Sequence, residues 1–64
     1  MRIVIVGAGY VGISTAVSLA YIGHEVICLD TDQDKIGLLR SGSFPIYEPW
    51  LEELASLARN RLDY

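Results

Sequence analysis

Hydrophobic residues follow one another without interruption in some parts of the chain and recur at helical spacing in others. Residues 3–6 form an uninterrupted β-branched apolar run, and it predicts a strand over 2–6 of the kind that is parallel and covered by helices on both faces. A second segment, mostly apolar, at 25–29 predicts a second strand. Between them, apolar residues recur at helical spacing over 10–22, and Gly23 supplies the left-handed residue that commonly ends a helix.

The second half of the chain predicts two further helices and the beginning of a third strand. Thr31 and Asp34 have the spacing of a capping box and predict a short helix that ends in the following Ser-Gly-Ser run. After a loop with two prolines, Pro49 suits the first position of a third helix that runs to about Arg59. Residues 62–64 begin a third strand that is too short to pair fully.

Three glycines, Gly7, Gly9 and Gly12, form a G-x-G-x-x-G motif between the first strand and the first helix. The bare motif is weak, because glycine triplets occur in many loops. Here it follows a strand, opens a helix and is completed by Asp30 at the end of the second strand. Gly7 permits the tight turn, Gly9 leaves room for a pyrophosphate, and Gly12 lets the helix pack closely on the strand. This combination predicts a dinucleotide-binding unit.

The expected ligand contacts lie at the start of the first helix and at the end of the second strand. Free N–H groups of residues 10–13 face the phosphates, with the positive end of the helix dipole behind them. The Asp30 carboxylate accepts hydrogen bonds from the adenosine ribose and repels a 2′-phosphate, which favours NAD over NADP. Lys35 either reaches back to the ribose or phosphates or is a solvated helix residue, and the sequence leaves both open.

This order of elements predicts an α/β fold: a partial Rossmann-like βαβα unit with parallel strands. Such a unit is the first half of a doubly wound NAD-binding domain, whose complete form has about six strands. A chain of 64 residues buries only about 60% of the surface that it exposes when unfolded. We therefore expect residues 1–64 to be a truncated N-terminal part of this domain, without catalytic and substrate domains.

The composition excludes several other classes of protein. Apolar residues make up 52% of the chain and charged residues 20%, which excludes intrinsic disorder. The net charge is −3, and the basic residues are scattered, so no nucleic-acid partner is expected. No apolar run approaches the roughly 18 residues that cross a bilayer, and the glycines interrupt the apolar core that a signal peptide requires. Cys28 is the only cysteine, which favours a cytoplasmic location.

Some residues that invite a catalytic interpretation have simpler explanations. Cys28 lies inside an apolar strand, where a thiol usually behaves as a small buried hydrophobe. Three glutamates near the start of the third helix are expected from the helix dipole alone: Glu48, Glu52 and Glu53. Trp50 either covers an edge of the core or faces a partner, and the sequence does not choose between these roles. No metal site is predicted.

The chain resembles the amino terminus of the UDP-glucose 6-dehydrogenases, within the UDP-glucose/GDP-mannose dehydrogenase family. The resemblance covers nearly the whole chain and is carried by residues 1–12, by Gly-His-Glu-Val at 23–26, by Asp30 with Asp32 and Lys35, and by Pro-Ile-Tyr-Glu-Pro at 45–49. The last segment is the more family-specific, since glycine motifs are shared widely. One departure is Trp50, because the family usually continues its Tyr-Glu-Pro with Gly-Leu.

This resemblance implies the two-step oxidation of a sugar-nucleotide C6 alcohol to a carboxylate, with two NAD and an enzyme-bound thioester. It implies NAD contacts in the glycine motif and beyond it, at Gly7, Gly9, Tyr10, Val11, Gly12, Asp30 and Lys35. The family's catalytic cysteine, lysine and aspartate and its UDP-sugar site belong to regions beyond Tyr64. We therefore expect no catalytic residue in this chain and no dehydrogenase activity from the chain alone.

Two other functions stay open. An FAD-dependent oxidoreductase also begins with a glycine motif and a second-strand acid, although that acid is commonly glutamate and the Pro-Ile-Tyr-Glu-Pro loop is not expected there. A non-enzymatic nucleotide-binding or interaction module is the other alternative. In each case an exposed sheet edge beside the first strand is expected to favour self-association of the isolated chain.

Overall fold

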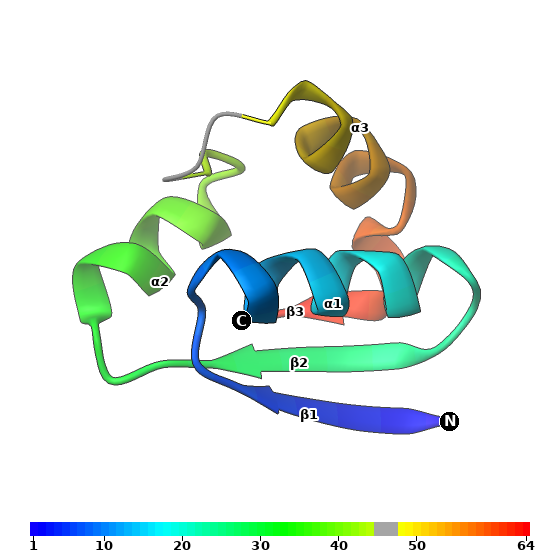
Figure 1. Ribbon diagram of the computed structural model, residues 1–64, viewed down its shortest axis with the longest axis horizontal. Coiled ribbons are helices and arrows are strands. Elements are labelled where there is room, and N and C mark those ends of the chain that lie inside the picture. The colour runs from blue at the N-terminus through cyan, green and yellow to red at the C-terminus, as the bar shows by residue number, and fades with distance from the viewer. Residues whose placement is uncertain (45–47) are drawn as a thin grey trace.

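The computed structural model describes residues 1–44 and 48–64 and contains one parallel sheet with helices packed on it (Figure 1). The elements follow in the order β1 (Arg2–Val6), α1 (Tyr10–Tyr21), β2 (Glu25–Leu29), α2 (Gln33–Arg40), α3 (Pro49–Leu57), the 3₁₀ turn η1 (Arg59–Arg61) and β3 (Leu62–Asp63). The strands lie side by side in the order β1-β2-β3. The predicted α/β fold, a partial Rossmann-like βαβα unit with a short third strand, is confirmed.

The helices lie on one side of the sheet (Figure 1). The prediction that helices cover both faces of the first strand is therefore wrong for the described residues. Ile3 and Ile5 pack against the core, whereas Val4 and Val6, which point to the other face, are 59% and 83% exposed. The reason is topological: right-handed crossovers that step in one direction along a sheet place every connecting helix on the same face.

A single hydrophobic core fills the space between the sheet and the helices. Its largest fully buried side chains come from every layer: Ile13 and Val17 of α1, Cys28 of β2, Leu39 of α2 and Leu51 of α3. α3 packs mainly on α1, and both helices bury alanines that allow a close approach. No helix in the described ranges is long and apolar enough to cross a membrane.

Glycines end α1 and α2 in the same way. α1 ends at Tyr21, one residue before the predicted end, and the chain turns at Gly23 with φ +116°. The N–H groups of Gly23 and His24 donate to the carbonyls of Ala20 and Leu19, each at 3.1 Å. This pair of bonds is the Schellman motif. α2 ends with the same pair of hydrogen bonds. They lie in the Ser-Gly-Ser run that was predicted to end this helix.

The residue that caps α2 is Asp32, and the predicted capping by Thr31 is wrong. The Asp32 carboxylate accepts hydrogen bonds from the N–H groups of Asp34 and Lys35, both at 3.1 Å. Asp32 is brought there because its own N–H donates to the Asp30 carboxylate at 2.8 Å, which turns the chain after β2. A carboxylate at this position also interacts favourably with the helix dipole.

The C-terminal part of the chain is tied to the end of α1. α3 ends at Leu57, before the predicted Arg59, which instead opens the 3₁₀ turn. The Arg61 guanidinium donates to the carbonyl of Ala20 at 2.8 Å and to that of Tyr21 at 3.4 Å. A cation at a helix C-terminus satisfies terminal carbonyls and complements the dipole. This contact ties the residue before β3 to the end of α1.

α1 lies close to the turn that precedes it because Gly12 has no side chain. A Cβ at this position would overlap the carbonyl oxygen of Gly7 and would lie 3.6 Å from Cγ2 of Ile5. The predicted packing role of Gly12 is confirmed. In contrast, a Cβ on Gly37, in the interior of α2, would meet no atom within 4 Å.

We predict that Gly12→Ala destabilises the chain by about 1–3 kcal/mol, because α1 must move away from the backbone of the turn. Gly37→Ala is the matched control and should stabilise the chain by up to about 1 kcal/mol, because alanine favours the helix and meets open space. Urea denaturation followed by circular dichroism measures both changes. A Gly12→Ala chain as stable as the wild type would contradict the close packing.

Candidate functional site

The glycine loop, residues 7–12, runs from the end of β1 into the first turn of α1. Gly7 has φ +99°, and its N–H donates to the carbonyl of Leu29 at 2.7 Å, so the loop is joined to the end of β2. Gly9 caps α1, and its carbonyl accepts the N–H of Ile13 at 2.9 Å. A Cβ on Gly9 would meet no atom within 4 Å. The loop therefore leaves open space beside the helix start.

The N-terminus of α1 has free backbone N–H groups that can bind a ligand. Among the described residues, no carbonyl or side chain accepts the N–H of Tyr10, Val11 or Gly12. The expectation that Ile13 also has a free N–H is wrong, because that group makes the first hydrogen bond of the helix. The first turn contains no acidic residue. Three free donors and the positive end of the helix dipole therefore favour an anion here.

The Asp30 carboxylate lies directly after β2 and joins the two neighbouring loops. Its Oδ2 accepts the N–H of Ala8 at 2.7 Å, and its Oδ1 accepts the N–H of Asp32 at 2.8 Å. These hydrogen bonds, from Asp32 first and then Ala8, lower the pKa of the Asp30 carboxyl below its ordinary value, and Lys35 adds to the effect. The side chain is 14% exposed. An ionised carboxylate thus stands at the edge of the glycine loop.

Lys35 reaches back from α2 toward this carboxylate. Its Nζ lies 3.8 Å from Oδ2 of Asp30, and its side chain is half-buried. Lys35 therefore reaches back to the end of β2 and is not fully solvated, and its contact with the ribose or phosphates stays a prediction. The distance is that of an ion pair without a hydrogen bond, so the ammonium N–H groups remain available to another acceptor.

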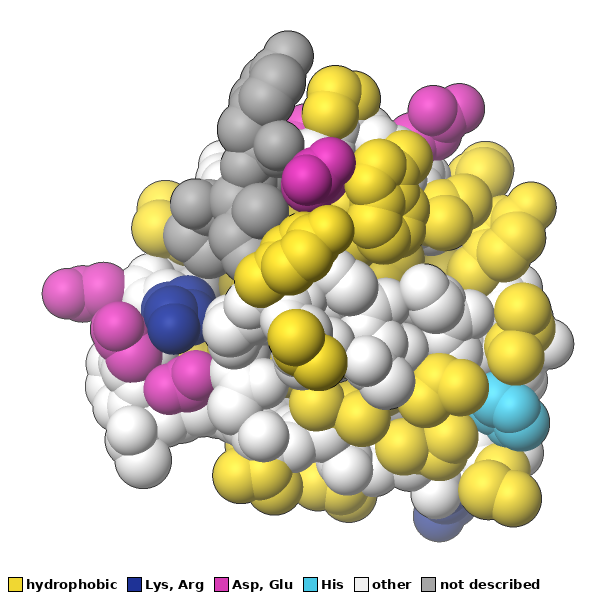
Figure 2. All heavy atoms as spheres, viewed as in Figure 1, with side chains coloured by type: hydrophobic (Ala, Val, Ile, Leu, Met, Phe, Trp, Pro, Cys, Tyr) yellow, Lys and Arg dark blue, Asp and Glu magenta, His cyan; other side chains and the backbone are white. Residues whose placement is uncertain are grey.

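The structure brings the predicted site residues to one edge of the sheet, where the strands end. Figure 2 shows acidic side chains gathered around a basic one over the connection from β2 to α2. One residue of the site was not predicted from the sequence: Ala8, whose N–H donates to the Asp30 carboxylate and whose side chain is buried. The only signal was its position between two glycines, which does not reveal a hydrogen bond to a residue 22 positions away.

The other residues considered from the sequence lie away from this edge or are inert. Cys28 is buried in the core as predicted, and burial raises the pKa of its thiol. Trp50 is 40% exposed, and its Nε1 donates to the Glu48 carboxylate at 3.2 Å, so it lies on the surface. Residues 45–47, the Pro-Ile-Tyr of the family-specific segment, lie outside the described residues. No group of three potential metal ligands occurs in the described ranges.

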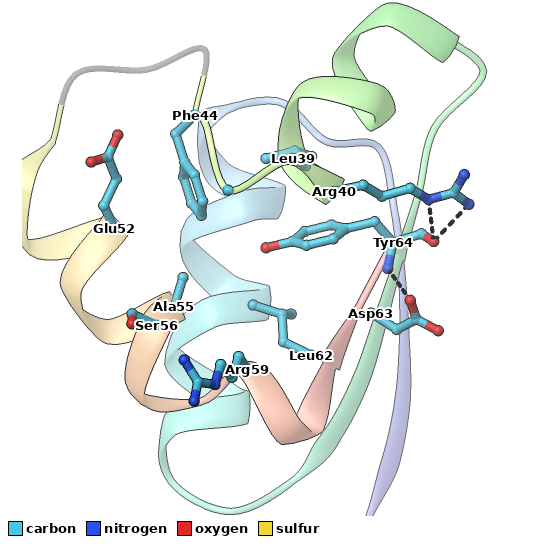
Figure 3. A pocket seen from close by; sticks show the side chains of 11 residues that line it. Leu39, Arg40, Phe44, Glu52, Ala55, Ser56, Arg59, Leu62, Asp63 and Tyr64 are labelled. Atoms are coloured by element: carbon cyan, nitrogen blue, oxygen red, sulfur yellow. Dashed lines mark hydrogen bonds between the residues drawn. The ribbon is translucent and has the colours of Figure 1, made fainter.

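A separate cavity of about 440 Å³ lies between α2, α3 and β3 (Figure 3). The ring of Tyr64 points into it beneath Phe44, and burial raises the pKa of Tyr64 to about 12. Arg40 crosses its rim and donates to the carbonyl of Tyr64 at 3.0 Å. Of the residues that line it in the described part of the chain, none belongs to the predicted nucleotide site. This cavity is therefore distinct from the edge at the glycine loop.

Known proteins of one family match the whole chain. The family model described as "UDP-glucose/GDP-mannose dehydrogenase family, NAD binding domain" matches residues 1–64. The chain is 50% identical over 66 residues to UDP-glucose 6-dehydrogenase YwqF of Bacillus subtilis and 44% identical over 66 residues to the UDP-glucose 6-dehydrogenase of Rhizobium meliloti. Each alignment covers 100% of this chain and 15% of the relative. The chain thus spans about a seventh of the length of these relatives.

Solved structures show the same fold. A ternary complex of GDP-mannose dehydrogenase from Pseudomonas aeruginosa superimposes with a TM-score of 0.90 and 48% identity, over 98% of this chain and 15% of that chain. The UDP-N-acetyl-mannosamine dehydrogenase Cap5O from Staphylococcus aureus superimposes with a TM-score of 0.91 and 31% identity, over 98% of this chain and 16% of that chain.

We predict that acid destabilises the chain partly through Asp30. The pKa of this carboxyl is lowered in the folded chain, whereas it is about 3.9 in an unfolded one. Its stabilising contribution is therefore complete above the unfolded value and is lost as the pH falls below about 4 through the folded value. Asp30→Asn should flatten this acid limb in urea midpoints measured against pH. An equally steep limb in the variant would contradict the assignment.

Proposed function

The chain belongs to the UDP-glucose/GDP-mannose dehydrogenase family, in its NAD-binding domain, and on this basis we propose that it holds the adenosine half of NAD at the glycine loop. The pyrophosphate lies against the free N–H groups of Tyr10, Val11 and Gly12. The Asp30 carboxylate accepts the ribose hydroxyls, and Lys35 lies beside them. When bound, NAD supplies the hydride acceptor of the reaction, and this chain binds and orients it.

One observation carries this proposal: an anion site and an ionised carboxylate lie next to each other at the same sheet edge. The donors at the start of α1 have no partner in the described residues, and the nearby space beside Gly9 is open. Asp30 is fixed by two backbone N–H groups. Donors for phosphate beside an acceptor for ribose are what a dinucleotide requires. The family assignment favours NAD over the FAD-dependent alternative.

For the parent protein, we propose oxidation of UDP-glucose to UDP-glucuronate with two NAD, with a UDP-sugar as its substrate and the cytoplasm as its location. The names of the curated relatives, UDP-glucose 6-dehydrogenases that match the whole chain, support this reaction. A GDP-mannose dehydrogenase is the second candidate, since a solved structure of that name is 48% identical. The 64-residue chain is expected to be inactive alone, because its one thiol, Cys28, is buried.

We predict that Gly9→Val in the full-length protein weakens NAD binding by about 100-fold or more. The valine side chain would fill the path of the pyrophosphate and remove charge-assisted hydrogen bonds, each of which contributes about 1.5–3 kcal/mol. The fold should tolerate the change, because Gly9 has φ −75° and the added atoms meet open space. Calorimetry measures the affinity, and thermal unfolding of the variant is the control. Wild-type affinity in a folded variant would refute the pyrophosphate site.

We predict that Asp30→Ala lowers the preference for NAD over NADP by about 10-fold or more. The variant loses the acceptor for the ribose hydroxyls and also the charge that repels a 2′-phosphate. Lys35 stays in place and can then pair with that phosphate. Calorimetric titration of the full-length protein with both cofactors gives the ratio of dissociation constants. A ratio equal to that of the wild type would show that Asp30 does not face the ribose.

A further inference from the structure

We propose that Asp30 is a positioning residue for the glycine loop as well as the acceptor for the ribose, so that one carboxylate couples the two halves of the nucleotide site. The inference rests on the proposed function, since it concerns the same site. The inference predicts that Asp30 raises the affinity even of ligands that do not contact its carboxylate.

The first step is the bond between Asp30 and the loop. Ala8 lies between two glycines, in the part of the backbone with the most conformational freedom. Two successive N–H groups hold this segment to the end of β2: Gly7 donates to the carbonyl of Leu29, and Ala8 donates to the Asp30 carboxylate, both at 2.7 Å. Only the bond from Ala8 depends on a side chain. Loss of this bond would leave the loop held by the Gly7 bond alone before α1 begins.

The second step is the use of the other carboxylate oxygen. Oδ1 of Asp30 accepts the N–H of Asp32, and Asp32 in turn caps α2. The carboxylate is thus fixed from two sides, with the Lys35 ammonium 3.8 Å away. A carboxylate offers about four acceptor positions, and the two backbone N–H groups use two of them. A ribose diol can therefore bind to the remaining positions without releasing the loop.

The third step concerns the phosphates. The free N–H groups at the start of α1 bind an anion well only when the preceding loop is already ordered, because ordering it during binding costs affinity. Asp30 orders this loop from the side where the ribose binds. The carboxylate therefore supports the phosphate contacts even though, as an anion, it repels a phosphate directly.

The test compares ADP with 2′,3′-dideoxy-ADP, which lacks the hydroxyls that Asp30 would accept. Affinities for the 64-residue chain and for Asp30→Ala are measured by NMR titration. A positioning role predicts that the variant loses about 10-fold in affinity for the dideoxy ligand and more for ADP. A role limited to the ribose predicts a loss for ADP alone, and this result would overturn the inference while the proposed function stands.

Asp34→Ala is the matched control. It removes one carboxylate from the exposed first turn of α2, close to the same site, without removing an acceptor from the glycine loop. Its affinity for dideoxy-ADP should equal or slightly exceed that of the wild type, because one repelling charge is gone. A loss as large as that of Asp30→Ala would overturn the inference, since the effect would then not depend on the hydrogen bond between Asp30 and the glycine loop.

Amide exchange in the absence of ligand gives an independent measurement. In Asp30→Ala the Ala8 N–H should lose its protection, while the Gly7 N–H, bonded to the backbone of β2, should keep it. Unchanged protection of Ala8 would overturn the inference whatever the affinities. If both amides lose protection, the variant has unfolded, and Asp30→Leu, which keeps a branched side chain of similar shape but has no acceptor oxygen, replaces it in the same comparisons. If ADP fails to bind the wild type, the proposed function fails, and exchange alone decides the positioning role.

Discussion

The attachment of the glycine loop to the end of β2 is the constraint on which the candidate site depends. The pairing of β1 with β2 brings the two strand ends to the same edge. Hydrogen bonds from Gly7 and Ala8 then fix the loop there, and the loop sets where α1 begins. As a result the free N–H groups of α1 and the Asp30 carboxylate, which are far apart in the sequence, lie side by side. The close approach at Gly12 keeps α1 in that position.

The uncovered face of the sheet follows from the same topology. Strands added in one direction by right-handed crossovers receive their helices on one face. Val4 and Val6 of β1 therefore lie beside Ile27 and Leu29 of β2 on a face that no helix of the described residues covers. The chain spans about a seventh of the length of its relatives. Exposed apolar side chains of this kind favour association, and self-association of the isolated chain stays a prediction.

Local patterns in the sequence predicted most of the fold. The strands at 2–6 and 25–29 and the helix ends at Gly23 and the Ser-Gly-Ser run depend on residues near in sequence, and the structure confirms them. The cap of α2 was assigned to the wrong residue, because Asp30 turns the chain and carries Asp32 into position. The Ala8 contact was missed for a similar reason: it joins residues that meet only after the strands pair. The glycine motif with Asp30 predicted a dinucleotide and favoured NAD over NADP, whereas the reaction and the substrate class came from the family resemblance alone.

If Asp30 holds the glycine loop as well as the ribose, any substitution that removes its acceptor oxygens changes cofactor preference and loop order together. A neutral, short side chain removes the repulsion of a 2′-phosphate, yet it also removes the acceptor for the Ala8 N–H, so the gain for NADP is offset by a looser phosphate site. A side chain that accepts a hydrogen bond without a negative charge separates the two effects. The carboxylate is therefore constrained twice, by the ligand that it selects and by the backbone that it orders.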